Sequence, residues 1–155
     1  MIIGVHSATF VKNWHEDVMP YIRMCKEAGY KSVEVSLLGQ TPYSAKEISK
    51  LASDLDISLT CTTGLSKEED ISCSDSHVQK NGVEALKRAI DMTSIMEANL
   101  LTGVVHAAWG ISNTMGKEKE DKFKNSSQSI KKISSLLTEK NIKLGIEPLN
   151  RYESD

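Results

Sequence analysis

The sequence has 155 residues, of which 39% are hydrophobic and 26% are charged, a composition typical of one soluble globular domain. Its 19 basic and 21 acidic residues are mixed along the chain and leave a formal charge of −2, so no basic face is available to bind nucleic acid. No apolar run approaches the ~20 residues that cross a bilayer, and residues 1–5 lack the basic region of a signal peptide. We therefore expect a cytoplasmic protein without nucleic-acid or membrane partners.

Five short apolar runs alternate with amphipathic segments along the chain. The predicted strands are residues 2–6, 32–37, 57–62, 100–106 and 143–149. Between them, apolar residues recur at helical spacing over residues 18–28, 44–55, 76–97 and 119–140. The predicted order is therefore a regular alternation of strands and helices.

Local signals mark the ends of the first two predicted helices. Pro20 is placed near the first turn of the first helix, and Gly29 is placed to end it. Ser44 and Glu47 have the spacing of a capping box, which predicts that the second helix begins at Ser44.

The alternation predicts right-handed βαβ units and a parallel sheet, in either a doubly wound open sheet or a (β/α)₈ barrel. Neither a Gly-x-Gly-x-x-Gly motif nor a Walker loop follows the first strand, which disfavours a nucleotide-binding sheet. The predicted fold class is α/β, a partial TIM-type (β/α) barrel with about five parallel strands and four helices of the usual eight. Residues 1–155 are expected to form a single incomplete barrel domain, truncated after strand five.

The three cysteines, Cys25, Cys61 and Cys73, are far apart and odd in number. They have neither the paired spacing of a zinc site nor the even count of a disulfide framework. We expect them to be reduced, with Cys25 and Cys61 in the core and Cys73 in a loop.

Alternation within the strands separates an apolar face from a polar one. The polar face is predicted to carry Gly4, His6, Glu34, Ser36, Thr60, Thr62, Gly145 and Glu147. The fourth run is apolar on both faces until His106, so alternation does not distinguish its faces. In a barrel the polar face points to the interior and, at the carboxyl ends of the strands, reaches the active-site mouth.

A carboxylate on that face is costly unless a cation or hydrogen bonds meet it, so Glu34 and Glu147 require partners. For both glutamates the alternative to a functional role is a structural ion pair or an exposed position at a strand end. For His6 and His106, a hydrogen-bonded histidine near a strand end is the alternative to a substrate contact.

Several short segments together resemble a known enzyme family. They are residues 4–10 with Trp14, residues 63–66, residues 108–110 and above all residues 145–153, which read Gly-Ile-Glu-Pro-Leu-Asn-Arg-Tyr-Glu. In order and spacing the chain resembles the D-tagatose 3-epimerase and D-psicose (allulose) 3-epimerase family, which belongs to the xylose-isomerase-like TIM barrel superfamily. The resemblance covers essentially all of the chain.

The resemblance implies carbohydrate metabolism, specifically metal-dependent C3 epimerisation of a ketose through an enediolate. By this match Glu147 corresponds to a metal ligand that is also one of two acid/base carboxylates. The substrate-binding residues that the resemblance implies are Glu153, Trp14, Gly64 and Trp109, and His6 is added to them from its place near a strand end. For the two tryptophans, packing within loops is an equal alternative.

The resemblance also implies a cofactor, a divalent ion such as manganese, magnesium or cobalt, for the complete enzyme. In the family an Asp, a His and a second Glu from later strands complete the metal site, and this chain ends at Asp155 before them. We expect weak or absent metal binding and no meaningful turnover from this chain alone. We also expect a homo-oligomer, or association through the open edges of the barrel.

Other functions remain open alternatives. One is a related isomerase of hydroxypyruvate, an inosose or a sugar phosphate, for which Arg151 is the only obvious phosphate-binding candidate. Another is a non-catalytic partial barrel. An endonuclease relative is disfavoured by the acidic balance and by too few histidines for a multinuclear zinc site.

Overall fold

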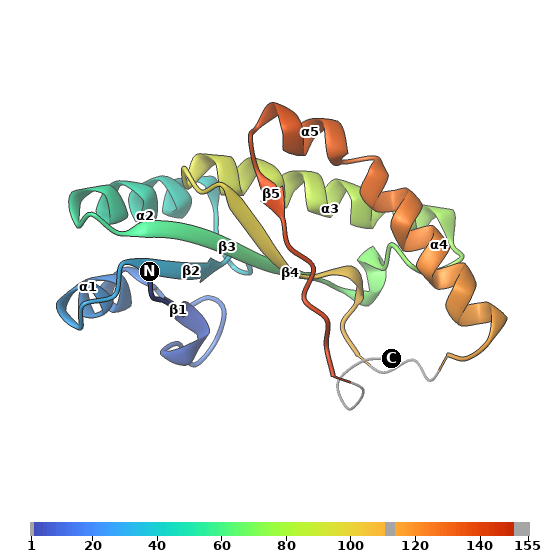
Figure 1. Ribbon diagram of the computed structural model, residues 1–155, viewed down its shortest axis with the longest axis horizontal. Helices are drawn as coiled ribbons and strands as arrows, with labels where there is room; N and C mark the ends of the chain where they lie inside the picture. The colour runs from blue at the N-terminus through green and yellow to red at the C-terminus, as the bar shows by residue number, and fades with distance from the viewer. Residues whose placement is uncertain (1, 111–113, 151–155) are drawn as a thin grey trace.

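The computed structural model describes residues 2–110 and 114–150 (Figure 1). The elements, in chain order, are β1 (Gly4–His6), η1 (Ser7–Thr9), α1 (Met19–Glu27), β2 (Ser32–Ser36), α2 (Pro42–Asp54), β3 (Ser58–Leu65), η2 (Lys67–Glu69), α3 (Ser76–Ile95), β4 (Leu100–Ala108), α4 (Lys117–Lys131), α5 (Ser134–Glu139) and β5 (Lys143–Leu144). The alternation of strands and helices predicted from the sequence is confirmed.

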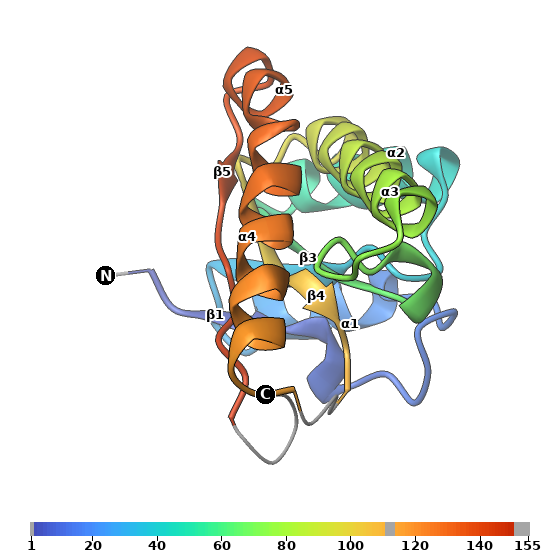
Figure 2. The ribbon, with the colours of Figure 1, turned by 90° about the vertical axis from the view of Figure 1, so that its right-hand side faces the viewer.

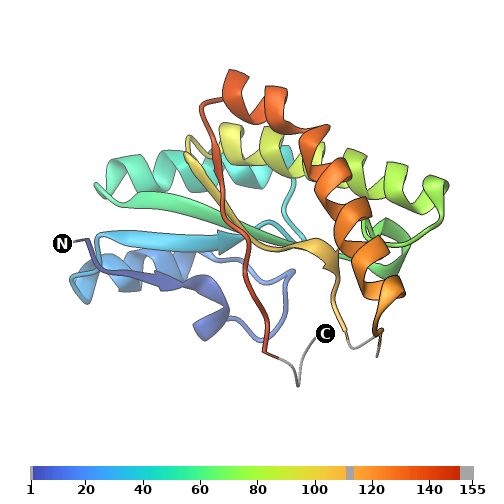
Figure 3. The ribbon, with the colours of Figure 1, turned by 45° about the vertical axis from the view of Figure 1, so that its right-hand side comes forward.

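The five strands form one parallel sheet in the order β1-β2-β3-β4-β5. The strands lie in the sheet in the same order as in the chain, as in a barrel. In a doubly wound sheet, by contrast, the order of the strands reverses part-way through the sheet. The strands also rotate progressively, so that β5 runs steeply across the direction of β2 and β3 (Figure 3). The open doubly wound alternative is therefore wrong for the described chain.

The core lies between the outer face of the sheet and the helices, with α2 and α3 side by side over it (Figure 2). Its buried members come from both layers and include Val33, Val35, Cys61, Leu101, Val105, Ile22, Ile48, Leu86 and Ile90. The predicted assignment of apolar residues to the outer face is confirmed for β2 and β3. Cys25 and Cys61 are buried and Cys73 is half-buried, all three as free thiols, which matches the prediction.

The first helix ends as predicted, but the N-cap of the second lies three residues earlier than the predicted capping residue, Ser44. Gly29 follows α1 with a φ of +91°, and Pro20 lies in its first turn. The N-cap of α2 is Thr41, whose hydroxyl accepts the Ser44 amide at 3.1 Å, while the Thr41 amide donates to Ser44 Oγ at 2.9 Å. Ser44 is therefore the N3 residue of the capping box, because Pro42 favours the N1 position directly after Thr41.

The predicted helix over residues 119–140 is wrong in being continuous. The structure has α4 and α5, joined by a tight turn at Lys132 and Ile133. In this turn the Lys132 and Ile133 amides donate to carbonyls three residues back instead of four. The bend places Ile133 fully inside the core, where burial of its side chain offsets the interruption.

The edge strands differ most from the prediction. Only Lys143 and Leu144 have strand geometry in β5, although backbone hydrogen bonds continue to Glu147. The apolar side chains Ile3 and Ile146, expected to meet helices, are 55% and 52% exposed. They lie at the two edges of the sheet, where packing partners are present on one side only. Within residues 2–110 and 114–150, no helix is long and apolar enough to cross a membrane.

Candidate active site

Strand register brings polar side chains together on the inner face of the sheet, opposite the helices. His6, Glu34 and Thr60 are register partners on β1, β2 and β3. Together with Gly4, Val5 and Ser32 they line a cavity of about 230 Å³. This is the face that the alternation of residues in the sequence assigned to the barrel interior.

Glu34 has protein partners for its carboxylate. The hydroxyl of Thr102 donates to Glu34 Oε1 at 2.6 Å, a short distance typical of a bond to a charged acceptor. The other oxygen, Oε2, lies 3.8 Å from His6 Nε2. The Glu34 side chain is 28% exposed. Glu34 thus connects β1 with β4 across the inner face.

His6 is held at the carboxyl end of β1. The Ala8 amide donates to His6 Nδ1 at 2.8 Å, which makes His6 the N-cap of η1. Because Nδ1 accepts a hydrogen bond, a neutral imidazole carries its proton on Nε2, the atom that faces Glu34. Both ring nitrogens are therefore turned toward the protein.

Glu147 lies beyond β5, where its amide donates to Gly103 O at 3.0 Å. Gly145, two residues earlier, faces Thr102, since a Cβ on Gly145 would lie 3.1 Å from Thr102 Cγ2. Because side chains alternate along an extended chain, Glu147 shares the inner side with Gly145 and Thr102. Its side chain is exposed at the carboxyl end of the sheet.

The remaining candidate residues follow the carboxyl ends of other strands. Trp14 is 39% exposed in the segment after β1, and Trp109 is 57% exposed after β4. Gly64 lies near the end of β3, where a Cβ would meet nothing within 4 Å. Glu153, the remaining candidate, lies outside the described residues.

Comparison with known proteins places this arrangement in a family. The profile of the family described as "Xylose isomerase-like TIM barrel" matches residues 22–155. The chain belongs to this family.

Its curated relatives in this barrel family are sugar epimerases. The chain is 23% identical over 158 residues to the D-psicose 3-epimerase of Enterocloster bolteae, covering 99% of this chain and 52% of that protein. It is 24% identical over 156 residues to the ketose 3-epimerase of Arthrobacter globiformis, covering 100% of this chain and 53% of the relative. The chain thus spans about half the length of the curated relatives that it matches.

Solved structures agree with the sequence matches. A D-psicose 3-epimerase crystallised in the presence of D-fructose superposes with a TM-score of 0.91 at 25% identity, over 100% of this chain and 55% of that one. An L-ribulose 3-epimerase gives a TM-score of 0.88 at 25% identity, over 99% and 52% of the two chains. The predicted partial barrel fold, with five parallel strands of a TIM-like barrel, is therefore confirmed.

Two residues of this xylose isomerase-like chain organise the site region but were not singled out from the sequence. Thr102 could not be assigned to the inner face from the sequence, because the fourth run has apolar residues on both faces. Asp70, which follows η2, accepts hydrogen bonds through Oδ1 from the Ser72 amide at 2.9 Å, the Ser72 hydroxyl at 2.6 Å and the Ala108 amide at 3.3 Å. It thereby ties the segment after β3 to the end of β4, beside Trp109. The Asp-x-Ser spacing is a turn signal that could have identified it.

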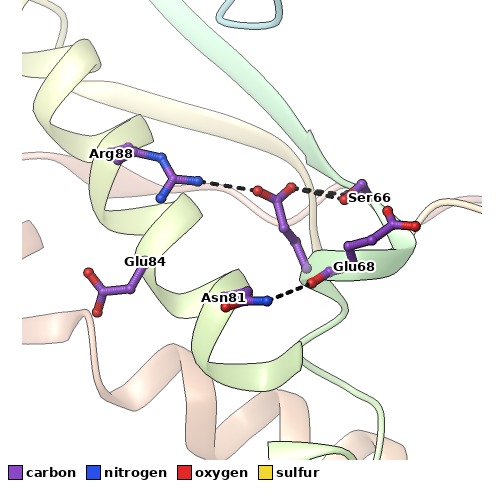
Figure 4. A pocket seen from close by; sticks show the side chains of 6 residues that line it. Ser66, Glu68, Asn81, Glu84 and Arg88 are labelled. Atoms are coloured by element: carbon purple, nitrogen blue, oxygen red, sulfur yellow. Dashed lines mark hydrogen bonds and ion pairs between the residues drawn. The ribbon is translucent and has the colours of Figure 1, made fainter. Parts of the chain in front are cut away.

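A second cavity, of about 290 Å³, lies between η2 and α3 (Figure 4). Its lining residues are Ser66, Glu68, Glu69, Asn81, Glu84 and Arg88. The Arg88 guanidinium donates to Glu69 Oε1 at 3.2 Å, and Glu84 pairs with Lys87 at 2.8 Å. None of the candidate residues from the sequence lines this cavity, and two of its charged groups, Arg88 and Glu69, pair with each other.

Proposed function

We propose that this chain is the part of a ketose 3-epimerase barrel that supplies one of two acid/base carboxylates, Glu147. The observation that carries the proposal is the position of Glu147 on the inner side at the carboxyl end of the sheet, within the Gly-Ile-Glu-Pro-Leu-Asn segment. Similarity to ketose 3-epimerases over nearly the whole chain supports it.

The reaction begins with removal of the proton on C3 of the ketose. The C–H electron pair moves into the C2–C3 bond, the carbonyl at C2 takes up the charge, and an enediolate forms. The exposed Glu147 carboxylate is able to accept this proton. Return of a proton to the opposite face of C3 inverts the centre, which requires a second acid on that face.

Glu34 does not fit the role of the second acid. It lies mid-strand in β2, in register with His6 and Thr60, and its Oε1 is occupied by the Thr102 hydroxyl. The Glu147 amide bonds to Gly103, one residue closer to the carboxyl end of β4 than Thr102. Glu34, which bonds to Thr102, therefore lies farther inside the barrel than Glu147, away from the mouth at the carboxyl ends of the strands. We propose that Glu34 supports the site and that the second acid lies outside residues 2–110 and 114–150.

The substrate contacts belong to the same proposal. Trp14, Trp109 and Gly64 follow strand ends at the mouth, where exposed aromatic rings can stack on the apolar face of a sugar. His6 and Glu153 complete the proposed set. Because both His6 nitrogens face protein groups, its contact with substrate would be through the ring face or edge.

The described residues do not by themselves fit a divalent metal. Ions such as manganese or magnesium take about six oxygen ligands, whereas the described part of the chain contains no group of three or more His, Cys, Asp or Glu placed to hold a metal. Metal dependence is therefore proposed for the complete enzyme only, with Glu147 as one ligand. For the 155-residue chain, calorimetric titration with manganese is expected to show no tight stoichiometric binding.

The test of the proposal is an assay for C3 epimerisation of unphosphorylated ketoses by the complete gene product that contains this chain. Glu147→Gln is expected to abolish turnover because an amide cannot accept the C3 proton. Glu139→Gln, which changes an exposed carboxylate of α5, is the matched control and is expected to retain activity. Undiminished turnover in Glu147→Gln would overturn the assignment.

A substrate screen separates ketoses from sugar phosphates. Arg151, the phosphate-binding candidate from the sequence, lies outside the described residues. The arginines in the described part of the chain, Arg23 and Arg88, lie on helices α1 and α3 and not at strand ends. A phosphate group binds best to a cluster of Arg or Lys, so we expect free ketoses to be turned over in preference to their phosphates. The reverse preference would support a sugar-phosphate isomerase.

A further inference from the structure

Thr102 lies between the two backbone hydrogen bonds that hold the segment after β5. The Gly145 amide donates to Leu101 O at 2.8 Å, and the Glu147 amide donates to Gly103 O at 3.0 Å. The side chain of Thr102 faces Gly145, whose hydrogen leaves room for the Thr102 methyl group. The position of Glu147 therefore depends on how this part of β4 is held.

The orientation of the Thr102 side chain is set from the other side of the sheet. Its hydroxyl has one proton and two nearby acceptors, Glu34 Oε1 at 2.6 Å and Cys61 O at 3.3 Å. The charged and closer acceptor forms the stronger bond. Because threonine is branched at Cβ, fixing the hydroxyl toward Glu34 also fixes the methyl toward Gly145.

Glu34 is suited to hold Thr102 because it is itself fixed. It lies in the middle of β2, paired on both sides by β1 and β3. Its other carboxylate oxygen faces His6 Nε2 at 3.8 Å, and His6 is in turn fixed by the Ala8 amide. The carboxylate therefore spans from β1 to β4 over the small side chains of β3.

We propose that Glu34 is a positioning residue that acts through Thr102 to set the position of the Gly145–Glu147 segment, and so the direction of the Glu147 carboxylate. The inference rests on the proposed function for its catalytic meaning. Its physical content, the coupling of Glu34 to the segment after β5, is independent of substrate and metal. The short β5 strand has few other contacts to define it.

The test is amide hydrogen exchange, measured by NMR on the 155-residue chain. In Glu34→Ala we expect exchange at the Gly145 and Glu147 amides to accelerate about tenfold, since a charge-assisted hydrogen bond that orders Thr102 is lost. The Lys143 amide, which donates to Asn99 O at 2.9 Å and lies away from Thr102, is expected to change little. The three-bond scalar couplings to the Thr102 methyl group should change from the values typical of one χ1 rotamer to values averaged over several rotamers.

Conservative variants separate positioning from general support of the sheet. Glu34→Gln keeps an acceptor for Thr102 and is expected to restore exchange to within about twofold of the original chain. In a Thr102→Val background, which lacks the hydroxyl, Glu34→Ala is expected to have no further effect at Glu147. Glu84→Ala, which removes an exposed carboxylate of α3, is the matched control.

Two results would overturn the inference. One is an unchanged Thr102 rotamer and unchanged exchange at Glu147 in Glu34→Ala. The other is equal acceleration at Lys143 and Glu147, which would show that Glu34 only stabilises the sheet. If Glu34→Ala does not fold, Thr102→Val alone decides, because it must accelerate Glu147 exchange selectively. Absence of epimerase activity from the complete gene product would contradict the proposed function, but it would not change these exchange results.

Discussion

Burial controls the chemistry of Cys61. The thiol is fully buried on β3, with Sγ 3.6 Å from the Met96 sulfur. Loss of hydration raises the pKa of Cys61 to about 12, because the thiolate is far less stable than the thiol away from water. The group is therefore protonated and inert at neutral pH, which makes it a structural residue and not a nucleophile.

We expect the buried thiol of Cys61 to make stability depend on pH in alkaline solution. In the unfolded chain a cysteine ionises near pH 9, whereas Cys61 in the folded chain stays protonated until about pH 12. The contribution to stability is complete below pH 9 and is lost as pH rises toward 12. Urea unfolding across this range should show the free energy of unfolding falling, with a smaller slope in Cys61→Ala.

Cys73→Ala is the matched control for this measurement. Cys73 is only half-buried, so its replacement is expected to change the slope less than Cys61→Ala. An identical pH slope in the original chain and in Cys61→Ala would show that the Cys61 thiol ionises equally in the folded and unfolded states.

Helix α3 contains a glycine at a point of close contact. A Cβ on Gly82 would collide with the Glu69 carbonyl oxygen of η2 and with Ile71 Cγ2. Glycine normally weakens a helix interior by about 1 kcal/mol relative to alanine. Here it allows the segment between β3 and α3 to pack directly on the helix.

The close contact at Gly82 reverses the usual effect of replacing glycine in a helix. Gly82→Ala is expected to destabilise the protein by about 1–3 kcal/mol, because overpacking forces backbone or side-chain shifts. Thermal unfolding measures this directly. The control is Ser94→Ala, a less crowded change in the same helix, which should have an effect within about 0.5 kcal/mol. A stabilised Gly82→Ala variant would show that helix and segment separate without cost.

The start of α2 gives a second prediction at the scale of an element. Thr41→Ala removes the hydroxyl that accepts the Ser44 amide and is expected to cost about 1 kcal/mol. Glu47→Ala, at the position that the sequence suggested for a capping box, is expected to have an effect within about 0.5 kcal/mol because Glu47 is exposed and lies in the body of the helix. Urea unfolding of the two variants measures which one loses more free energy of unfolding. A larger loss in Glu47→Ala than in Thr41→Ala would support the capping box that begins at Ser44.

Sequence alone predicted the elements and their order because hydrophobic periodicity records which face of each element is buried. It also placed Glu34 on the inner face, because Val33 and Val35 on either side of it face the helices.

The sequence did not predict the role of Thr102. At Gly103 the backbone of β4 has a φ of +122°, and a Cβ there would collide with the Thr63 carbonyl oxygen of β3. Strand β4 is therefore irregular at this point, where it pairs with β3. A local irregularity of this kind interrupts the two-residue alternation of side chains from which strand faces are predicted. The break between α4 and α5 was also not predicted, because an apolar residue such as Ile133 has the same place in the hydrophobic pattern whether it lies in a helix or in a turn.

At the scale of the whole molecule, the sheet has two edges with unpaired backbone groups. β1 pairs only with β2, and β5 pairs only with β4, among the described residues. Apolar side chains stand exposed beside both edges, Ile3 next to β1 and Ile146 next to β5. In a closed barrel both edges would be paired and these side chains covered. We propose that the 155-residue chain associates through these edges.

Replacement of the edge side chains tests this association. Ile146→Lys is expected to weaken self-association at least about tenfold, because a buried isoleucine contributes roughly 1.5–3 kcal/mol and a lysine opposes strand pairing. Sedimentation equilibrium over a range of protein concentrations gives the dissociation constant. Phe123→Lys is the control, since Phe123 is also an exposed apolar residue but lies on helix α4 and not on a strand of the sheet. Association weakened by Phe123→Lys and not by Ile146→Lys would place the contact on the helical side of the molecule. The twist and short length of the edge strands would then have to be what prevents them from pairing with another chain.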